Sequence, residues 1–405
     1  MNKGPLDGVM VLDFTQFEAG TVCTQTLAWL GATVIKLEKP EIGEQGRRSS
    51  ADKPGQDSYG FIILNSNKKS VTVDVKKPEG RELIYRMVEK ADVFVENFSP
   101  GVIERLGFDY EKLKDINPGI IYAQIKGFGS DGPYAEFPAF DAIGQAVGVV
   151  MSITGEKDGP PMHAGTNLAD SGTGYHCAIG ILAALYEKEI TGKGQKVEVA
   201  MQDVMINFSR SAWGRQLMTG KDAPRVGNEM PMAPVAPCNV YPCKPGGPND
   251  YVFIYTSRMP TSPQWKRLLQ VIGRTDLEDD QRFATPESRY EHREIIDEII
   301  SEWTKKRTKN EAMEMLGRAQ VPAGAVLSTT DVTNDPYLNK RGTVVTIKHP
   351  QRGEMKIPGN SIRLSNSTVS IQPAPLLGEH NDEVYRGLFE LSQKELEELE
   401  QKGVI

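Results

Sequence analysis

The residues whose types and spacing could do chemistry gather in one stretch, GTNLADSGTGYHCAIGILAAL, at positions 165–185. Asp170 stands at the head of an apolar, glycine-dotted pattern that predicts a helix. A carboxylate there can cap the helix, or it can act as a covalent nucleophile whose intermediate is stabilised by backbone N–H groups. The cap is the commoner role. Gly165, Gly172 and Gly174 favour the nucleophile because glycines leave room for a ligand near the backbone. The residues alone do not decide between a helix cap and a nucleophile.

Other motifs of catalytic or binding chemistry are incomplete. The turn DFTQFEAGTVCT after the first predicted strand holds one glycine, Gly20, and therefore lacks the G-x-G-x-x-G of a dinucleotide site. The sequence contains no G-x-S-x-G elbow and no G-x-x-x-x-G-K-[ST] loop. Cys238 and Cys243 have no second ligand pair at a similar spacing, and the histidines are scattered, so we expect no metal site.

Composition narrows the class of protein further. The net charge of −7 comes without any stretch rich in Lys and Arg, which disfavours nucleic-acid binding. No apolar run is long enough to cross a membrane, and the start of the sequence lacks a signal-peptide pattern. Four cysteines in 405 residues make no disulfide framework. We expect a cytoplasmic protein with no membrane or nucleic-acid partner.

The elements that must position Asp170 alternate in type along the first half of the sequence. Predicted strands cover residues 8–14, 33–40, 69–75, 91–98, 119–129 and 196–201. Predicted helices cover residues 21–32, 78–91, 178–195 and 202–220. Strands that alternate with helices predict a parallel sheet covered on both faces, which is an α/β fold.

The second half changes in character. Residues 225–250 are dense in Pro and Gly and read as a linker. Beyond them we expect one strand at 251–256, two helical segments at 262–273 and 293–319, short strands at 342–350 and 353–359, and a charged helix at 392–403. A chain of this length predicts two domains, and we place a smaller one at 226–330.

The sequence resembles the class III coenzyme A-transferases, the family that includes formyl-CoA:oxalate and carnitine CoA-transferases. The resemblance is carried by a series of segments in the same order and spacing. They are PLDGVMVLDFTQFEAG, LGATVIKLEKP, NSNKKSVTVDVKKPEG, DVFVENFSPGVIERLGFDYE, INPGIIYAQIKGFGSDGPY, NLADSGTGYHCAIGILAALYEKEITGKGQKVEVAMQD and APLLGEHNDEVY. Each segment alone is weak, and together they cover nearly the whole chain.

The resemblance implies a CoA-transferase with Asp170 as its catalytic aspartate. Asp170 would attack an acyl-CoA thioester to give a mixed anhydride and then an aspartyl-CoA thioester, from which a carboxylic acid displaces CoA. The glycines beside Asp170 would leave space for these intermediates. Coenzyme A is then a substrate, with no tightly bound cofactor and no metal. An oxalate-type small acid is the expected acceptor.

The resemblance also assigns a CoA site by position. Glu18 and Ala19 would lie beside the acyl group, Asn97 and Phe98 along the pantetheine, and Lys39 and Arg105 at the phosphates. Val73, Asp74, Val75 and Lys76 would lie near the adenine. Phe140 and Asp141 complete the predicted site. The acyl-CoA racemases of the family carry a histidine at the position of Phe140, so the missing second base disfavours racemisation.

The fold implied is a Rossmann-like large domain built from both chain ends, residues 1–225 and 331–405, with a smaller α/β domain inserted and an interlocked homodimer. Two positions depart from the oxalate enzymes. Glu18 replaces a glutamine, and a carboxylate there would repel a small dianion. Ser49 replaces a tryptophan, which widens the pocket. The alternatives are an acyl-CoA racemase of the same fold and a non-catalytic acyl-CoA-binding protein.

Overall fold

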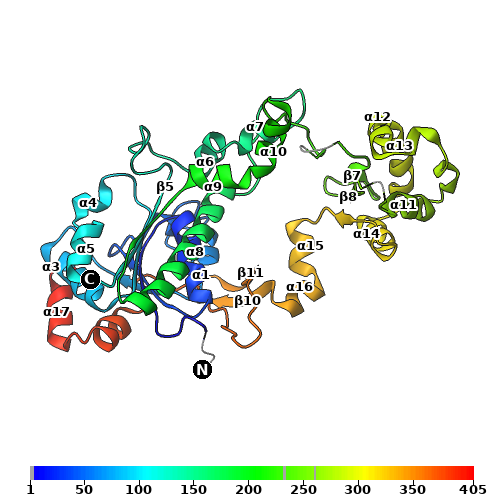
Figure 1. Ribbon diagram of the computed structural model, residues 1–405. Helices are drawn as coiled ribbons and strands as arrows, with labels where there is room; N and C mark the ends of the chain where they lie inside the picture. Colours follow the sequence, from blue (N-terminus) through cyan, green and yellow to red (C-terminus); the bar gives the residue numbers. More distant parts are fainter. Residues whose placement is uncertain (1–3, 231–233, 260) are drawn as a thin grey trace. The chain divides into compact units, whose positions relative to one another are not determined.

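A computed structural model describes residues 4–230, 234–259 and 261–405 (Figure 1). Contacts divide the chain into two compact units. Unit 1 comprises Met1–Val150, His163–Phe208 and Pro336–Ile405, and unit 2 comprises Met151–Met162 and Ser209–Asp335. The boundaries of the smaller domain that the sequence predicts, 226 and 330, stay a prediction.

Unit 1 is built on a parallel sheet of six strands in the part of the chain that the structure describes. They are β1 (Met10–Phe14), β2 (Thr33–Glu38), β3 (Lys69–Thr72), β4 (Val93–Glu96), β5 (Ile121–Lys126) and β6 (Lys196–Ala200). Their order is β3-β2-β1-β4-β5-β6, and every pair is parallel. This is the doubly wound strand order. In such sheets ligands bind at the carboxyl edge between β1 and β4, because the chain leaves β1 toward one side of the sheet and β4 toward the other.

Both faces of the sheet are covered, because apolar side chains of successive strand residues point to opposite sides. One core contains Val11, Val34, Val93 and Ile121, with apolar residues of α1 (Ala19–Trp29), α8 (Leu168–Thr191) and α9 (Met201–Phe208). The other contains Leu12, Ile35, Phe94 and Tyr122, with residues of α3 (Pro78–Lys90), α4 (Val102–Leu106), α5 (Tyr110–Ile116) and α17 (Gln393–Gln401). The α/β prediction is confirmed (Figure 1).

The remaining elements of unit 1 are short. They are α2 (Tyr59–Leu64), α6 (Asp141–Val147), α16 (Pro336–Arg341), the antiparallel pair β10 (Val344–His349) and β11 (Gly353–Pro358), the 3-10 helix η1 (Gln45–Arg47) and the π-helix η4 (Glu383–Leu388). The chain first passes from unit 1 to unit 2 within α7 (Val150–Ile153). The C-terminal segment therefore returns to the unit that holds the parallel sheet.

Unit 2 has its own core around a small antiparallel sheet. Its strands are β7 (Cys238–Pro242), β8 (Tyr251–Tyr255) and β9 (Ala323–Ala325), in the order β7-β8-β9. Its α-helices in the described residues are α10 (Arg210–Thr219), α11 (Gln264–Ile272), α12 (Pro286–Glu291), α13 (Arg293–Thr304), α14 (Lys309–Arg318) and α15 (Thr329–Asn334).

Three expectations about elements were wrong. The predicted linker 225–250 contains β7, whose Cys238 and Tyr241 are buried, so its prolines and glycines flank a strand of the unit 2 core. The predicted helix 202–220 is two helices, α9 and α10. The predicted helix 293–319 is also divided, because the Thr308 side chain accepts a hydrogen bond from the N–H of Glu311 and starts α14.

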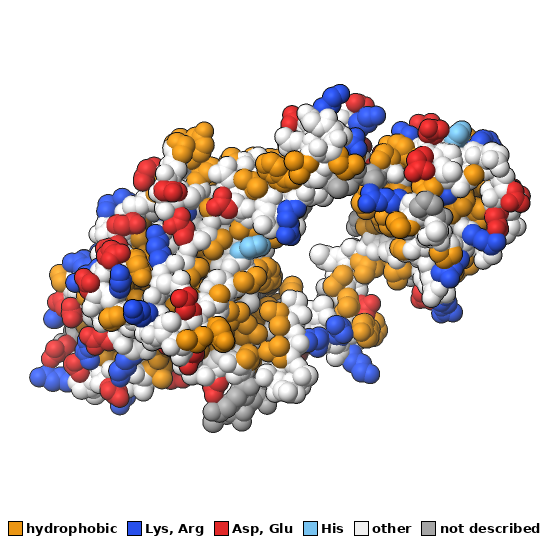
Figure 2. Space-filling view, viewed as in Figure 1, with side chains coloured by type: hydrophobic (Ala, Val, Ile, Leu, Met, Phe, Trp, Pro, Cys, Tyr) orange, Lys and Arg blue, Asp and Glu red, His pale blue; other side chains and the backbone are white. Residues whose placement is uncertain are grey.

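The outer face of α8 is apolar. Tyr175, Ile179, Tyr186 and Ile190 are between 43% and 73% exposed. Their spacing of four, seven and four residues keeps them on one side of the helix. Figure 2 shows hydrophobic side chains gathered on the face of unit 1 that α8 crosses. An exposed apolar stripe of this kind marks a surface suited to contact with another molecule.

Candidate active site

A cleft of about 240 Å³ opens at the carboxyl edge of the parallel sheet in unit 1. Asp170 lines it. The segments after β1, β4 and β5 line it too, with Gln16, Phe17, Glu18, Ala19, Asn97, Phe98, Ser99, Pro100, Gly127, Phe137, Pro138, Ala139 and Phe140. The volume is below the roughly 300–1,000 Å³ of sites that enclose a drug-sized ligand, so the cleft fits a small molecule or one end of a larger one.

Asp170 belongs to the first turn of α8 but does not cap it. The N-cap residue is Asn167, whose side chain makes no cap hydrogen bond. The free N–H groups are satisfied by Asp141 at the start of α6, whose Oδ1 accepts from Ala169 N at 2.7 Å and from Asp170 N at 3.1 Å. Because another carboxylate does the capping, the side chain of Asp170 is left available for chemistry.

Burial, together with the negative charges of Glu18 and Asp141, raises the pKa of Asp170 to about 7. The positive end of the α8 dipole acts in the opposite sense, and these three effects outweigh it. Among the described residues, none donates a hydrogen bond to the Asp170 carboxylate. A carboxylate with so little stabilisation is more basic, and therefore more nucleophilic when ionised, than an ordinary aspartate.

Glu18 reaches from the start of α1 to the start of α8. Its Oε1 accepts a hydrogen bond from Ser171 Oγ at 2.8 Å, and its Oε2 accepts one from Asn167 Nδ2. Asn167 and Ser171 flank Asp170 in the sequence. The carboxylate of Glu18 is therefore fixed against the same helical turn that carries Asp170.

The turn between β1 and α1 is anchored by a second pair of hydrogen bonds. Gln16 N donates to Asn97 Oδ1 at 2.8 Å, and Asn97 Nδ2 donates to Gln16 O at 2.9 Å. Phe17 takes a positive φ of 56°. Thr21 Oγ1 donates back to the carbonyl oxygens of Phe17 and Glu18. These contacts fix the backbone that carries Glu18 to the end of β4.

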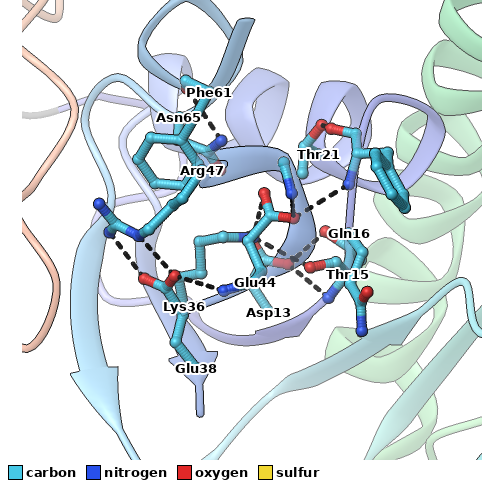
Figure 3. Close-up of polar contacts among 12 residues, drawn as sticks. Asp13, Thr15, Gln16, Thr21, Lys36, Glu38, Glu44, Arg47, Phe61 and Asn65 are labelled. Carbon is cyan, nitrogen blue, oxygen red and sulfur yellow. Dashed lines mark hydrogen bonds and ion pairs between the residues drawn. The ribbon is translucent and has the colours of Figure 1, made fainter. Parts of the chain in front are cut away.

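Buried charges lie beneath the same turn (Figure 3). Asp13 Oδ1 accepts hydrogen bonds from Thr15 N and Thr15 Oγ1, and Lys36 Nζ donates to Thr15 O at 3.0 Å. Phe17 N donates to Glu44 Oε2 at 3.3 Å. Burial opposes ionisation of Asp13, but Lys36 and Lys68 outweigh it and lower its pKa to about 2. The turn is thus held in part by the Asp13 carboxylate, which stays ionised at neutral pH.

A neighbouring ion pair, also drawn in Figure 3, holds the segment after β2. Arg47 contacts Glu38 through both Nε and Nη2, at 2.6 and 2.8 Å, and contacts Asp57 at 2.8 Å. Its guanidinium lies 3.8 Å from the centre of the Phe61 ring. Gln45, between Glu44 and Arg47, reaches the cleft. The contacts of Arg47 therefore hold residues 39–48 in place.

The glycines around Asp170 serve packing more than ligand access. A Cβ on Gly174 would lie 2.5 Å from Ala19 O and 2.9 Å from Val22, so this glycine lets α8 cross α1 closely. A Cβ on Gly172 would lie 2.8 Å from the Phe208 ring. Gly165 alone among these three faces open space. The expectation that Gly172 and Gly174 leave room for a ligand was wrong, because protein atoms fill that room.

The structure brings about half of the predicted site residues into one cleft. Asp170, Glu18, Ala19, Asn97, Phe98 and Phe140 line it. Asp141 lies directly behind Asp170. The others follow the carboxyl ends of neighbouring strands, on the same edge of the sheet but outside the cleft lining. They are Lys39 after β2, Val73, Asp74, Val75 and Lys76 after β3, and Arg105 in α4 after β4.

These outer residues differ in accessibility. Lys39, Lys76 and Arg105 are exposed, and Val73 is buried. Asp74 Oδ1 accepts a hydrogen bond from Lys76 N, which shapes the turn after β3. Ser49 is exposed and does not line the cleft, where Gln45 does.

Several contributors were not found from the sequence. Asn167 and Ser171 hold Glu18, and Lys126 at the end of β5 lines the cleft. The two contacts to Glu18 join residues 149 and 153 positions apart, which no local pattern encodes. Within residues 4–230, 234–259 and 261–405, no group of three or more His, Cys, Asp or Glu side chains could hold a metal ion. No helix in these ranges is long and apolar enough to cross a membrane.

Comparison with known proteins identifies the family. The model of CoA-transferase family III matches residues 6–381. The chain belongs to CoA-transferase family III.

Two full-length relatives of this CoA-transferase carry the same name. The formyl-CoA:oxalate CoA-transferase of Streptomyces avermitilis is 43% identical over 99% of both chains, and that of Streptomyces coelicolor is 42% identical over the whole of both. A solved CAIB/BAIF family protein from Brucella suis covers 96% of this chain and 100% of its own, with 35% identity and a TM-score of 0.83. The protein is an enzyme that acts on CoA thioesters and carboxylates.

Proposed function

We propose that this CoA-transferase moves CoA from an acyl-CoA to a small carboxylic acid through covalent intermediates on Asp170. The observation that carries the proposal is the state of the Asp170 side chain. It lines a cleft at the ligand-binding edge of the sheet, burial raises its pKa to about 7, and Asp141 relieves it of capping. A helix cap or a solvated surface carboxylate has none of these properties.

In the first half-reaction, a carboxylate oxygen of Asp170 attacks the thioester carbonyl of the donor. The C–S bond breaks, leaving a mixed anhydride on Asp170 and free CoA thiolate. The thiolate then attacks the Asp170 carbonyl carbon and expels the donor acid as its carboxylate, which gives an aspartyl-CoA thioester. Low hydration of Asp170 supports this step, because a carboxylate in water is a weak nucleophile.

In the second half-reaction, the acceptor carboxylate attacks the aspartyl thioester carbonyl and displaces CoA thiolate. The thiolate attacks the acceptor's carbonyl in the new anhydride, which releases the acyl-CoA product and restores the Asp170 carboxylate. Atoms and charge balance with no oxidant, reductant or metal. The names of the relatives make oxalate the first acceptor to test.

The CoA moiety is proposed to extend from the cleft along the carboxyl edge of the sheet. Asn97 and Phe98 line the inner end of this route, and the cations Lys39, Lys76 and Arg105 would meet the phosphates. Exposed lysine and arginine side chains beyond a narrow cleft suit a ligand with a short acyl end and a polyanionic nucleotide end.

We also propose a homodimer. The apolar stripe of Tyr175, Ile179, Tyr186 and Ile190 on α8 supports it, since contiguous exposed apolar side chains on one helix face mark surfaces that contact other molecules. Light scattering after size exclusion is expected to give twice the chain mass. The described cysteines are all free thiols, in keeping with a reducing, cytoplasmic setting.

The experiment that tests the function is intact-protein mass spectrometry after incubation with a panel of acyl-CoAs and trapping with hydroxylamine or borohydride. We expect an adduct on Asp170 with at least one donor, and its loss in Asp170→Ala. CoA binding without an adduct for any donor would contradict covalent transfer and favour a non-catalytic binder. Deuterium exchange at the α-carbon of a branched acyl-CoA, retained in Asp170→Ala, would favour a racemase.

A further inference from the structure

The charge of the cleft bears on which acids it admits. Among the described residues that line it, Glu18 and Asp170 carry the acidic groups, and Lys126 is the one cation. Lys126 already has an ion-pair partner and a hydrogen-bond acceptor. Its Nζ lies 2.8 Å from Glu96 Oε1 and donates to Phe98 O at 2.6 Å, and the Glu96 side chain is fully buried. The cleft therefore presents negative charge with no free positive partner for a second carboxylate.

The charge of Glu18 is held in place without being neutralised. Both of its hydrogen bonds come from uncharged donors, the Asn167 amide and the Ser171 hydroxyl. Neutral donors fix the direction of a carboxylate and leave its charge in the site. Since Asn167 and Ser171 belong to the turn of α8 that carries Asp170, Glu18 cannot swing away without breaking these two contacts.

The proposed reaction brings an acceptor carboxylate to the Asp170 carbonyl, with the rest of the acceptor in a cleft of about 240 Å³. A monocarboxylate places a neutral group beside Glu18. A small dicarboxylate places a second negative charge there, and like charges that approach in a partly buried site repel strongly. Each oxygen of Glu18 keeps a free lone pair, so a hydroxyl on the acceptor can donate to it.

We propose that Glu18 is a specificity-determining residue that restricts the acceptor to small monocarboxylates whose tail is neutral or donates a hydrogen bond. The inference rests on the proposed function and narrows its substrate class. It separates this chain from the activity in its relatives' names, because oxalate is a dianion at neutral pH.

The experiment compares oxalate with glycolate, two acids of equal carbon number, as acceptors from the donor that forms the Asp170 adduct. We expect kcat/KM of the wild-type enzyme to favour glycolate by about tenfold or more, given the cost of opposed like charges. Glu18→Gln keeps the size of the side chain and removes its charge. It should lower the glycolate-to-oxalate ratio by about tenfold, mainly through KM for oxalate.

Two further variants separate charge from packing. Glu18→Ala also removes the charge and should move the ratio in the same direction. Ser171→Ala removes one hydrogen bond and keeps the charge, so the ratio should stay near the wild-type value. An equal shift in Ser171→Ala would overturn the proposal, because it would trace the selectivity to the position of α8. Thermal melts of all three variants show whether each is folded.

The adduct assay distinguishes the two levels of the hypothesis. An Asp170 adduct together with a wild-type preference for oxalate, or with a ratio unchanged by Glu18→Gln, overturns the role of Glu18 and leaves covalent transfer intact. Absence of an adduct with every donor overturns the proposed function and this inference with it.

Discussion

The carboxylate of Asp141 accepts a hydrogen bond from the backbone N–H of Asp170 at 3.1 Å. It also accepts one from the N–H of Ala169 at 2.7 Å, so a side chain at the start of α6 completes the first turn of α8. The sequence left two roles open for Asp170, helix cap and nucleophile. In the structure Asp141 takes the capping role. Asp141 stabilises the helix, and Asp170 keeps a half-buried, destabilised carboxylate facing the cleft.

The first prediction follows from this division. Burial and the charges of Glu18 and Asp141 raise the pKa of Asp170 from its ordinary 3.8 to about 7 in the folded state. Well below pH 3.8 the Asp170 carboxyl is protonated in both states, so its shifted pKa does not affect stability there. As the pH rises to 7, Asp170 ionises first in the unfolded chain, so the cost of this side chain to the free energy of unfolding grows. Above pH 7 the side chain is ionised in both states and the cost has reached its full value. Asp170→Asn should therefore stabilise the protein by about 2–4 kcal/mol at pH 8, an upper range set by about 1.4 kcal/mol for each pKa unit.

Chemical denaturation at pH 8 and pH 4.5 measures this difference, and the gain should shrink markedly at the lower pH. Asp141→Ala is the matched control. It removes the acceptor of two helix N–H groups and should destabilise the protein by about 1–3 kcal/mol. Loss of stability in Asp170→Asn, at either pH, would return Asp170 to a structural role.

The second prediction concerns the pH dependence of the reaction. The ionised form of Asp170 is the nucleophile, so the rate of adduct formation in a single turnover should rise about tenfold per pH unit up to pH 7 and level above it. Glu18 is the larger of the two charges that raise this pKa. Glu18→Gln should therefore move the midpoint of the profile to lower pH. A profile that is flat from pH 5 to 8 would contradict the assignment.

The third prediction concerns the buried charges beneath the turn that carries Glu18. Lys68 Nζ donates to Asp13 Oδ2 at 2.9 Å and to Thr24 Oγ1 at 2.8 Å, with both charged side chains fully buried. Burial lowers the pKa of Lys68 to about 8, with Asp13 opposing that effect. Lys68→Met should cost about 3–5 kcal/mol in the free energy of unfolding, because it removes the nearer of the two cations from the buried Asp13 carboxylate and leaves Lys36 at 4.0 Å.

The neighbouring residue offers a matched control. Lys69 pairs with Glu383 at 2.6 Å on the surface, where the two side chains are 29% and 58% exposed. The same change, Lys69→Met, should alter stability by less than about 1 kcal/mol. Urea denaturation of both variants makes the comparison. Similar losses would mean that the network under the turn is not a special source of stability.

The fourth prediction tests the route of the CoA nucleotide. Arg105 is exposed in α4, after β4. If it meets a phosphate, Arg105→Ala should raise KM for the acyl-CoA by about tenfold, the effect of losing one charge-assisted contact. The N-acetylcysteamine thioester of the same acid has no nucleotide, so its kcat/KM should not change. An equal loss with both substrates would place the effect elsewhere.

The parallel sheet and the family were predictable because both rest on patterns that recur along the chain. Alternating strands and helices specify the sheet, and ordered segments specify the family. The division of labour between Asp141 and Asp170 was not predictable, since the residues that meet are 29 positions apart and both are plain aspartates. The clamp of Asn167 and Ser171 on Glu18 is more distant still. Sequence also records that Gly174 lacks a side chain, but not which atoms approach it.

The close contact between Gly174 and Ala19 yields the last prediction. A Cβ on Gly174 would lie 2.5 Å from the carbonyl oxygen of Ala19, a backbone atom that cannot swing aside. Gly174→Ala must therefore push α8 from α1, which separates Asp170 from Glu18. It should lower the free energy of unfolding by about 1–3 kcal/mol and reduce adduct formation as well. Gly317 in α14 has no atom within 4 Å of an added Cβ, so Gly317→Ala should instead stabilise by about 0.5–1 kcal/mol through helix propensity. If Gly174→Ala were as harmless as Gly317→Ala, the close crossing of α1 and α8 would not be what fixes the two carboxylates.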